Sequence, residues 1–172
     1  YRSKVEYGSY GINHYLGCGH GCLYCSQMRR CIRFKQCRDR RDWMAAKPIK
    51  NAIELTQTGI EHFWGTSRLG EWVCLCWATD PYQPIEEELR LTSKILKMLV
   101  DRHIPVRILT KSEGIYQDED TIIRHKDLVW AGFTITTVDD AVGRKWEPNA
   151  SAIHDRAKAI KYFHANGVKT WV

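Results

Sequence analysis

The chain has 172 residues, of which 44% are hydrophobic and 27% charged, and its formal net charge is +6, a balance typical of one globular domain with its own core. It contains no run of about 18 apolar residues, which excludes a membrane-spanning helix from our expectations. Residues 1–7 lack the apolar stretch of a signal peptide, so we expect a cytoplasmic location, where cysteines stay reduced.

Short apolar runs alternate with longer amphipathic ones. The pattern predicts strands at 11–16, 71–78, 106–110, 128–136 and 168–172, with helices between them at 50–64, 85–102, 118–125 and 152–166. Strands that alternate with helices favour a parallel sheet with right-handed crossovers. We therefore expect an α/β fold in which residues 1–172 form one domain with about five parallel strands. A terminal apolar strand would leave a sheet edge uncovered, so we also expect a partial barrel, abbreviated or truncated from a larger one.

The helix at 85–102 carries the clearest end signal. Pro84 suits a helix start, and Glu86, Glu87 and Glu88 complement the positive end of the helix dipole. We expect this helix to be continuous.

The positive charge is concentrated in residues 29–50. This segment holds nine basic and two acidic residues, a net charge of +7, so the rest of the chain carries −1. The basic residues are Arg29, Arg30, Arg33, Lys35, Arg38, Arg40, Arg41, Lys47 and Lys50. Such a block can bind the phosphate backbone of DNA or RNA. A solvated helix face or loop explains it equally well.

Three of the seven cysteines lie on one glycine-rich loop after the first predicted strand. Cys18, Cys22 and Cys25 have the spacing C-x3-C-x2-C. An odd number of cysteines excludes a fully paired disulfide framework, and a tight group of cysteines in a reducing compartment predicts a metal site. Three thiolates on one loop can reach three corners of a [4Fe–4S] cluster. Because the loop has no fourth cysteine, one iron of the cluster would have no protein ligand and could bind another molecule.

One alternative for this loop is a metal with four protein ligands. Cys31 or Cys37, inside the basic segment, could supply the fourth and give a zinc site or a closed cluster. His20 lies too close to its neighbouring cysteines for easy tetrahedral geometry, so we expect it beside the metal rather than on it. Outside this alternative, the sequence assigns no role to the remaining cysteines, which are Cys31, Cys37, Cys74 and Cys76.

The cysteine loop, with the aromatic Tyr24 before its last cysteine, resembles that of the radical S-adenosylmethionine (radical SAM) superfamily. Three further segments, in the same order along the chain, make it resemble the spore photoproduct lyase-like, or DNA repair photolyase, group of that superfamily. They are Thr79-Asp80-Pro81-Tyr82-Gln83-Pro84, Leu109-Thr110-Lys111-Ser112 and Thr134-Ile135-Thr136-Thr137. Each lies at the C-terminal end of a predicted strand, where (β/α) barrels place their chemistry.

The resemblance implies a partial (β/α) barrel that binds S-adenosylmethionine (AdoMet) on the open iron of a [4Fe–4S] cluster. In this family an external donor reduces the cluster, AdoMet is cleaved, and a 5′-deoxyadenosyl radical takes hydrogen from the substrate. The implied roles are cluster ligation by Cys18, Cys22 and Cys25, adenine contact by Tyr24, amine contact by Thr79 and Asp80, carboxylate contact by Lys111, and ribose contact by Thr136 or Thr137.

The chain departs from the lyases at one position. Their hydrogen-donating cysteine lies near the turn after the second strand, where this chain has Trp77, and Cys76 on a strand would point to the opposite face. We therefore do not expect repair of a thymine dimer. We expect a lyase-like radical SAM enzyme that acts on nucleic acid or another macromolecule. The alternatives are a non-catalytic nucleic-acid-binding module with zinc or a closed cluster, and a radical enzyme for a small metabolite or a peptide.

Overall fold

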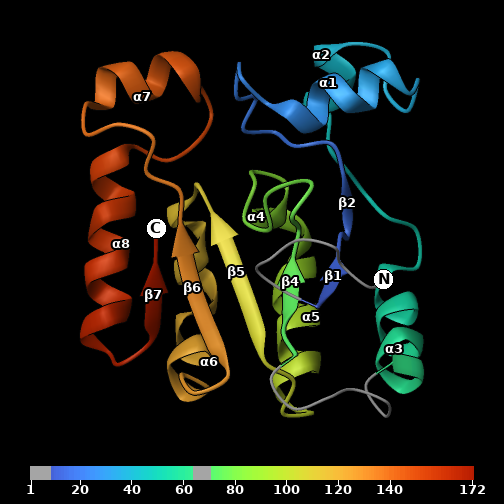
Figure 1. The fold of residues 1–172 in the computed structure, drawn as a ribbon, viewed down its shortest axis with the longest axis vertical. Helices are drawn as coiled ribbons and strands as arrows, with labels where there is room; N and C mark the ends of the chain where they lie inside the picture. Colours follow the sequence, from blue (N-terminus) through green and yellow to red (C-terminus); the bar gives the residue numbers. More distant parts are fainter. Residues whose placement is uncertain (1–8, 64–70) are drawn as a thin grey trace.

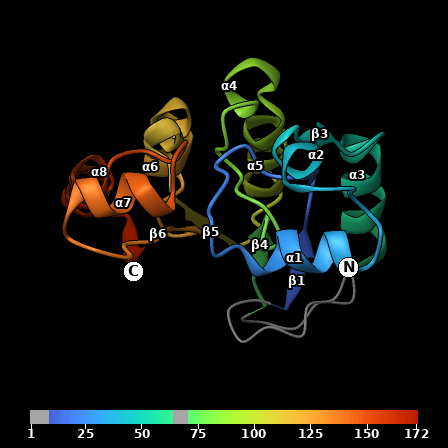
Figure 2. The ribbon, with the colours of Figure 1, turned by 90° about the horizontal axis from the view of Figure 1, so that it is seen from above.

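The computed structural model describes residues 9–63 and 71–172, which form a parallel sheet with helices against one face (Figures 1 and 2). The sheet order is β1-β4-β5-β6-β7, and all four pairings are parallel. The strands are β1 (Tyr10–Ile12), β4 (Val73–Leu75), β5 (Val106–Thr110), β6 (Val129–Phe133) and β7 (Lys169–Trp171). The prediction of an α/β fold with five parallel strands is therefore confirmed.

Four helices cover one face of this sheet, as the view from above shows (Figure 2). They are α3 (Ala52–Phe63), α5 (Leu91–Val100), α6 (Glu119–Arg124) and α8 (Ile153–Ala165). Alternate residues of β5, such as Val106 and Ile108, are fully buried against Leu96, Leu99 and other apolar side chains of this layer. The connections between the strands return the chain to the same end of the sheet each time, so the strands run parallel and their C-terminal ends meet at one edge. No helix within the described residues is long and apolar enough to cross a membrane.

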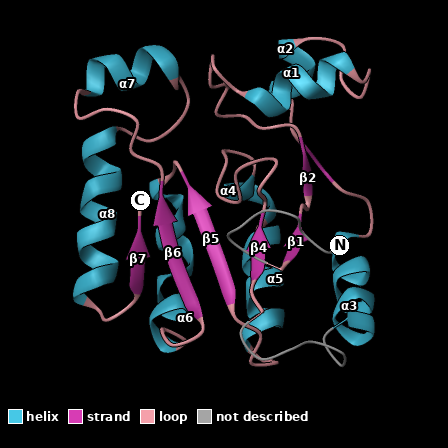
Figure 3. Ribbon diagram, viewed as in Figure 1, coloured by secondary structure: helices cyan, strands magenta, loops and turns pink. Residues whose placement is uncertain are grey.

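Shorter elements gather at that C-terminal edge (Figure 3). They are α1 (Ser26–Arg33), α2 (Arg40–Met44), α4 (Glu86–Leu89), a 3-10 turn (Glu113–Asp118) and α7 (Asp140–Trp146), with a two-stranded antiparallel sheet of β2 (Tyr15–Leu16) and β3 (Lys47–Pro48). The sequence pattern did not predict α1, α2 or α7. These helices are short, and polar residues dominate them, so they carry little periodic apolar signal.

Three predicted strands end at least three residues earlier than expected. The strand predicted at 11–16 leaves the parallel sheet after Ile12, where the Asn13 side chain accepts a hydrogen bond from the Ala78 backbone at 3.1 Å. The strand predicted at 71–78 ends at Leu75, because Cys76 has a φ of 52°, in the left-handed region that strands do not contain. The strand at 128–136 likewise ends at Phe133.

The helix predicted at 85–102 is broken at Arg90, whose φ is 51°. The reason lies in Glu86, a buried residue whose carboxylate accepts hydrogen bonds from the backbone of Leu91 at 3.0 Å and Thr92 at 2.9 Å. The carboxylate thus caps a new helix start at α5, where an acidic group satisfies free amides and the helix dipole. The expectation of one continuous helix was wrong. The predicted helix end at Trp64 lies outside the described residues.

Candidate active site at the cysteine loop

A cavity of about 230 Å³ lies at the C-terminal ends of the strands. It joins the cysteine loop to the segments that follow β4, β5 and β6. Seven of the nine residues predicted for the site line it. They are Cys18, Cys22, Tyr24, Cys25, Thr79, Asp80 and Lys111. Segments that lie far apart in the sequence therefore meet in one cavity at this edge of the sheet.

The cysteine loop is held on one side by α2. Gly17 has a φ of 85°, and a side chain there would run into the Trp43 carbonyl oxygen. That carbonyl accepts a hydrogen bond from the Cys18 amide at 2.9 Å, and the Arg40 guanidinium donates to the Gly21 carbonyl at 2.6 Å. Glycine at position 17 is therefore required for the loop to approach α2 this closely.

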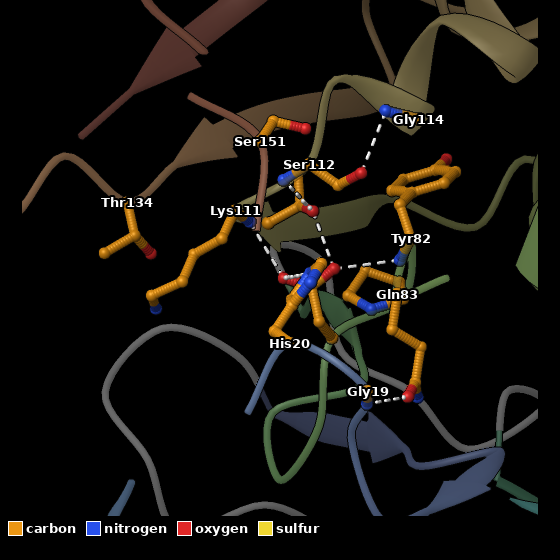
Figure 4. A network of polar contacts seen from close by, with 12 residues as sticks. Gly19, His20, Tyr82, Gln83, Lys111, Ser112, Gly114, Thr134 and Ser151 are labelled. Atoms are coloured by element: carbon orange, nitrogen blue, oxygen red, sulfur yellow. Dashed lines mark hydrogen bonds and ion pairs between the residues drawn. The ribbon is translucent and has the colours of Figure 1, made fainter. Parts of the chain in front are cut away.

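On its other side the loop is held by residues 146–149 and by Gln83. The Asn149 side chain donates to the Gly19 carbonyl at 2.9 Å, and the Leu23 amide donates to the Trp146 carbonyl at 2.9 Å. The Gln83 side chain accepts from the Gly19 amide at 2.8 Å (Figure 4). The loop is thus fastened to three different parts of the fold, which suits a site that must hold a fixed geometry.

Asp80 lines the cavity, and four neighbouring protein groups contact its carboxylate. Its carboxylate accepts hydrogen bonds from the Tyr82 amide at 2.9 Å, the Thr110 hydroxyl at 2.6 Å and the Lys111 amide at 2.8 Å, and it lies 3.2 Å from the buried His20 ring. Burial by itself would raise the pKa of Asp80, but His20, Thr110 and the Lys111 amide lower it to about 2. The carboxylate is therefore ionised and fully engaged by the protein.

Three cysteine thiols line one cavity, and three thiolates are a donor set that a [4Fe–4S] cluster can take. Within residues 9–63 and 71–172, no group of three His, Cys, Asp or Glu side chains is arranged to hold one ion. Burial raises the pKa of the Cys18 thiol far above its ordinary value and that of Cys22 to about 11, so bound metal would be needed to keep both as thiolates. The donor set therefore fits a [4Fe–4S] cluster with three protein ligands.

Tyr24 is held at the cavity by a buried ion pair. Its hydroxyl donates to the Glu147 carboxylate, which pairs with Arg156 at 2.6 Å. Glu147 and Arg156 are each 1% exposed, and Arg156 also donates to the Thr134 carbonyl at 2.9 Å. The Lys111 ammonium lies 5.9 Å from the centre of the Tyr24 ring, a cation–π arrangement. One cation and one aromatic ring thus face the cavity together.

The predicted residues of the segment after β6 lie outside the cavity lining. Thr136 donates to Glu147 at 3.2 Å, and the Thr137 hydroxyl accepts from the Asp139 amide at 3.1 Å. Thr134, in the same segment, does line the cavity. The ribose role of Thr136 or Thr137 stays a prediction.

The other four cysteines divide into three places. Cys31 and Cys37 are buried with Met28 and Trp43, beside the cysteine loop. Cys74 is buried in β4, and Cys76 lines the cavity next to Trp77. The expectation that Cys76 and Trp77 point to opposite faces assumed that both lie on a continuous strand. The backbone at Cys76 is left-handed, so the strand does not continue there.

Sequence reasoning assigned no role to the residues that hold the loop. They are Gln83, which lies within one of the recognised segments, and Glu147, Asn149 and Arg156. Their partners lie far away in the chain: Tyr24 and Glu147 are 123 positions apart, and Gly19 and Asn149 are 130 apart. No local pattern marks such contacts. A buried charged pair such as Glu147 and Arg156 becomes visible only when both residues are placed in the fold.

No family model matches the chain. Among curated proteins, the chain is 27% identical over 169 residues to the uncharacterized protein MJ0683 of Methanocaldococcus jannaschii. That match covers 98% of this chain and 60% of the relative, so the chain spans less than two thirds of its relative's length.

Three solved structures of spore photoproduct lyase match almost the whole chain. A cysteine-to-serine mutant superposes with a TM-score of 0.70, while a double mutant with bound AdoMet and dinucleoside spore photoproduct and a complex with the same dinucleoside each reach 0.71. The chain has the fold of spore photoproduct lyase. Each alignment covers 99% of this chain but 46% of the lyase, at 18% identity, so the likeness to spore photoproduct lyase is one of fold.

Proposed function

We propose that this chain is a radical SAM enzyme whose cavity binds a [4Fe–4S] cluster and AdoMet. The observation that carries the proposal is that the thiols of Cys18, Cys22 and Cys25 share one cavity with Asp80 and Lys111. The fold of spore photoproduct lyase, one structure of which holds AdoMet, supports it. A cluster bound there would supply the electron that cleaves the carbon–sulfur bond of AdoMet and so yields a 5′-deoxyadenosyl radical.

In this proposal Lys111 binds the methionine carboxylate, because its ammonium faces the cavity and a compact point charge suits that anion. Tyr24 lies beside Lys111 and contacts the adenine. Asp80 acts as a positioning residue: four protein groups already use its oxygens, so it orients His20 and the start of the Lys111 segment. Thr79 remains available to the methionine amine, and Thr134 is better placed than Thr136 for the ribose.

We also propose that the substrate is a nucleic acid. The +7 segment at residues 29–50 folds into α1, α2 and their connections, beside the cysteine loop. One structure of spore photoproduct lyase, which has the same fold, is a complex with dinucleoside spore photoproduct. That complex supports nucleic acid as the substrate class for this chain. A long positive segment beside the site would attract a phosphate backbone.

The proposal is tested by AdoMet cleavage. The chain is reconstituted anaerobically with iron and sulfide, reduced, and given AdoMet, and 5′-deoxyadenosine is measured by chromatography. We expect product from the wild type and at least a 10-fold loss with Lys111→Ala, since removing a charge-assisted contact to the carboxylate costs more than about 1.4 kcal/mol. Lys161→Ala, an exposed lysine on α8, is the matched control and should retain the activity.

Absence of 5′-deoxyadenosine, together with stoichiometric zinc in the protein, would contradict the proposal. That result would favour the non-catalytic module, for which the burial of Cys31 and Cys37 beside the cysteine loop is the supporting observation.

A further inference from the structure

A second hollow lies between α1 and β2, next to the candidate active site. It is a groove of about 740 Å³ whose lining includes Gln27, Arg30, Phe34 and Gln36. Trp43, Ala78 and Thr79 line both this groove and the cavity that holds the three thiols. The groove therefore runs along α1 to the wall of the candidate active site.

Arg30 lines the groove, and Arg29 and Arg33 lie on the same helix, α1. Arg29, Arg30 and Arg33 on α1 are exposed and form no ion pair with any residue in 9–63 or 71–172. The acidic residues of the segment are already engaged, since Asp39 caps α2 and Asp42 pairs with Arg38 and Lys47. The arginines of α1 are thus the groups to which an anionic partner would bind.

An exposed aromatic ring stands among these charges. Phe34, at the end of α1, is 60% exposed. The guanidinium carbons of Arg30 and Arg33 lie 5.8 Å and 6.0 Å from the centre of its ring. An exposed ring flanked by two cations gives a stacking surface beside two phosphate-binding groups.

We propose that this groove binds a single-stranded nucleic acid, with one base stacked on Phe34 and the adjoining phosphates on Arg30 and Arg33. The side-chain amides of Gln27 and Gln36 lie along the same groove and can bond base edges, which have both donors and acceptors. A duplex would hide the base faces that Phe34 needs, and an acidic peptide would not use the ring. That the strand leads toward the thiol cavity rests on the proposed function, whereas the binding itself does not.

The test is fluorescence anisotropy with labelled 12-nucleotide single strands of DNA and RNA and a duplex of the same length, at several salt concentrations and without AdoMet. We expect either single strand to bind more tightly than the duplex. Phe34→Ala should weaken binding at least about 5-fold, which is the smallest effect expected when one stacked base is lost. Phe34→Trp keeps an aromatic ring and should bind as tightly as the wild type. The double variant Arg30→Gln/Arg33→Gln should make the slope of log affinity against log salt shallower by about 1.4.

The matched control is Arg124→Gln/Lys161→Gln, which removes two exposed charges from α6 and α8 and should leave the salt slope unchanged. Equal affinity of Phe34→Ala and Phe34→Trp would overturn the proposal. So would duplex binding as tight as single-strand binding, or competition by poly-glutamate as strong as by unlabelled oligonucleotide. Because AdoMet is absent, a failure here is separate from a failure of AdoMet cleavage.

Discussion

Buried charged side chains do much to fasten the cysteine loop. His20 pairs with Asp80, and Tyr24 reaches Glu147, which pairs with Arg156. All four charged or titratable partners, His20, Asp80, Glu147 and Arg156, are buried. A buried charge is tolerated only when it is paired and hydrogen-bonded, so each residue depends strongly on its partner.

Replacing Glu147 tests this dependence. Glu147→Gln leaves the Arg156 guanidinium buried without its counter-charge, and we expect a loss of about 3–5 kcal/mol in the free energy of unfolding. Tyr24→Phe removes a single hydrogen bond from a half-exposed ring and should cost about 1 kcal/mol. Denaturant titration by circular dichroism measures both.

Lys158→Gln is the control, because it breaks an exposed ion pair with Asp155 on the same helix, α8, and should cost less than about 1 kcal/mol. An effect of Glu147→Gln no larger than that of Lys158→Gln would show that the buried pair does not stabilise the fold.

Among the elements, those with a strong local pattern were predicted well. The strand at 106–110 is found as predicted, and the helix at 152–166 differs by a residue at each end from Ile153–Ala165. The break at Arg90 was not predictable, because it depends on where the Glu86 carboxylate lies in the folded chain. The site shows the same division: its four motifs could be found in sequence, and the distant groups that hold the loop could not.

The cysteine loop is the element most sensitive to backbone substitution. Gly17→Ala places a side chain at a φ of 85° and against the Trp43 carbonyl, so we expect a loss of at least about 2 kcal/mol in stability and reduced iron incorporation. The comparison variant is Gly59→Ala in α3, where a new Cβ meets no described atom within 4 Å. Because alanine favours the helix over glycine, this variant should raise the free energy of unfolding by about 1 kcal/mol. Thermal unfolding and iron analysis of both variants check this. A neutral Gly17→Ala would mean that the loop does not need glycine there.

At the scale of the whole molecule, one buried histidine links the edge of the sheet to the helix layer. His14 follows β1, is 1% exposed, and lies 2.8 Å from the Thr92 hydroxyl of α5. Burial lowers the pKa of His14 from 6.5 to about 4. The imidazole ring of His14 is therefore neutral in the folded chain at neutral pH.

This pKa predicts a pH dependence of stability. Below pH 6.5 His14 is protonated in the unfolded chain, whereas in the folded chain it stays neutral down to about pH 4. The contribution of His14 to the free energy of unfolding is therefore complete above pH 6.5 and is lost as the pH falls toward 4. Between pH 7 and pH 5 we expect this residue to remove about 2 kcal/mol from the free energy of unfolding. Urea titrations at both pH values should show a larger loss for the wild type than for His14→Gln. An equal loss in the two proteins would contradict the role of His14.

The central claim is a cluster held by three cysteines with one iron open to AdoMet, and electron paramagnetic resonance of the reduced chain tests it most directly. We expect about four iron and about four sulfide per chain, a [4Fe–4S] signal that changes when AdoMet is added, and the same behaviour in Cys31→Ser and Cys37→Ser. If the signal does not change when AdoMet is added, or if it disappears in Cys31→Ser or Cys37→Ser, the cluster has a fourth protein ligand and the claim is contradicted.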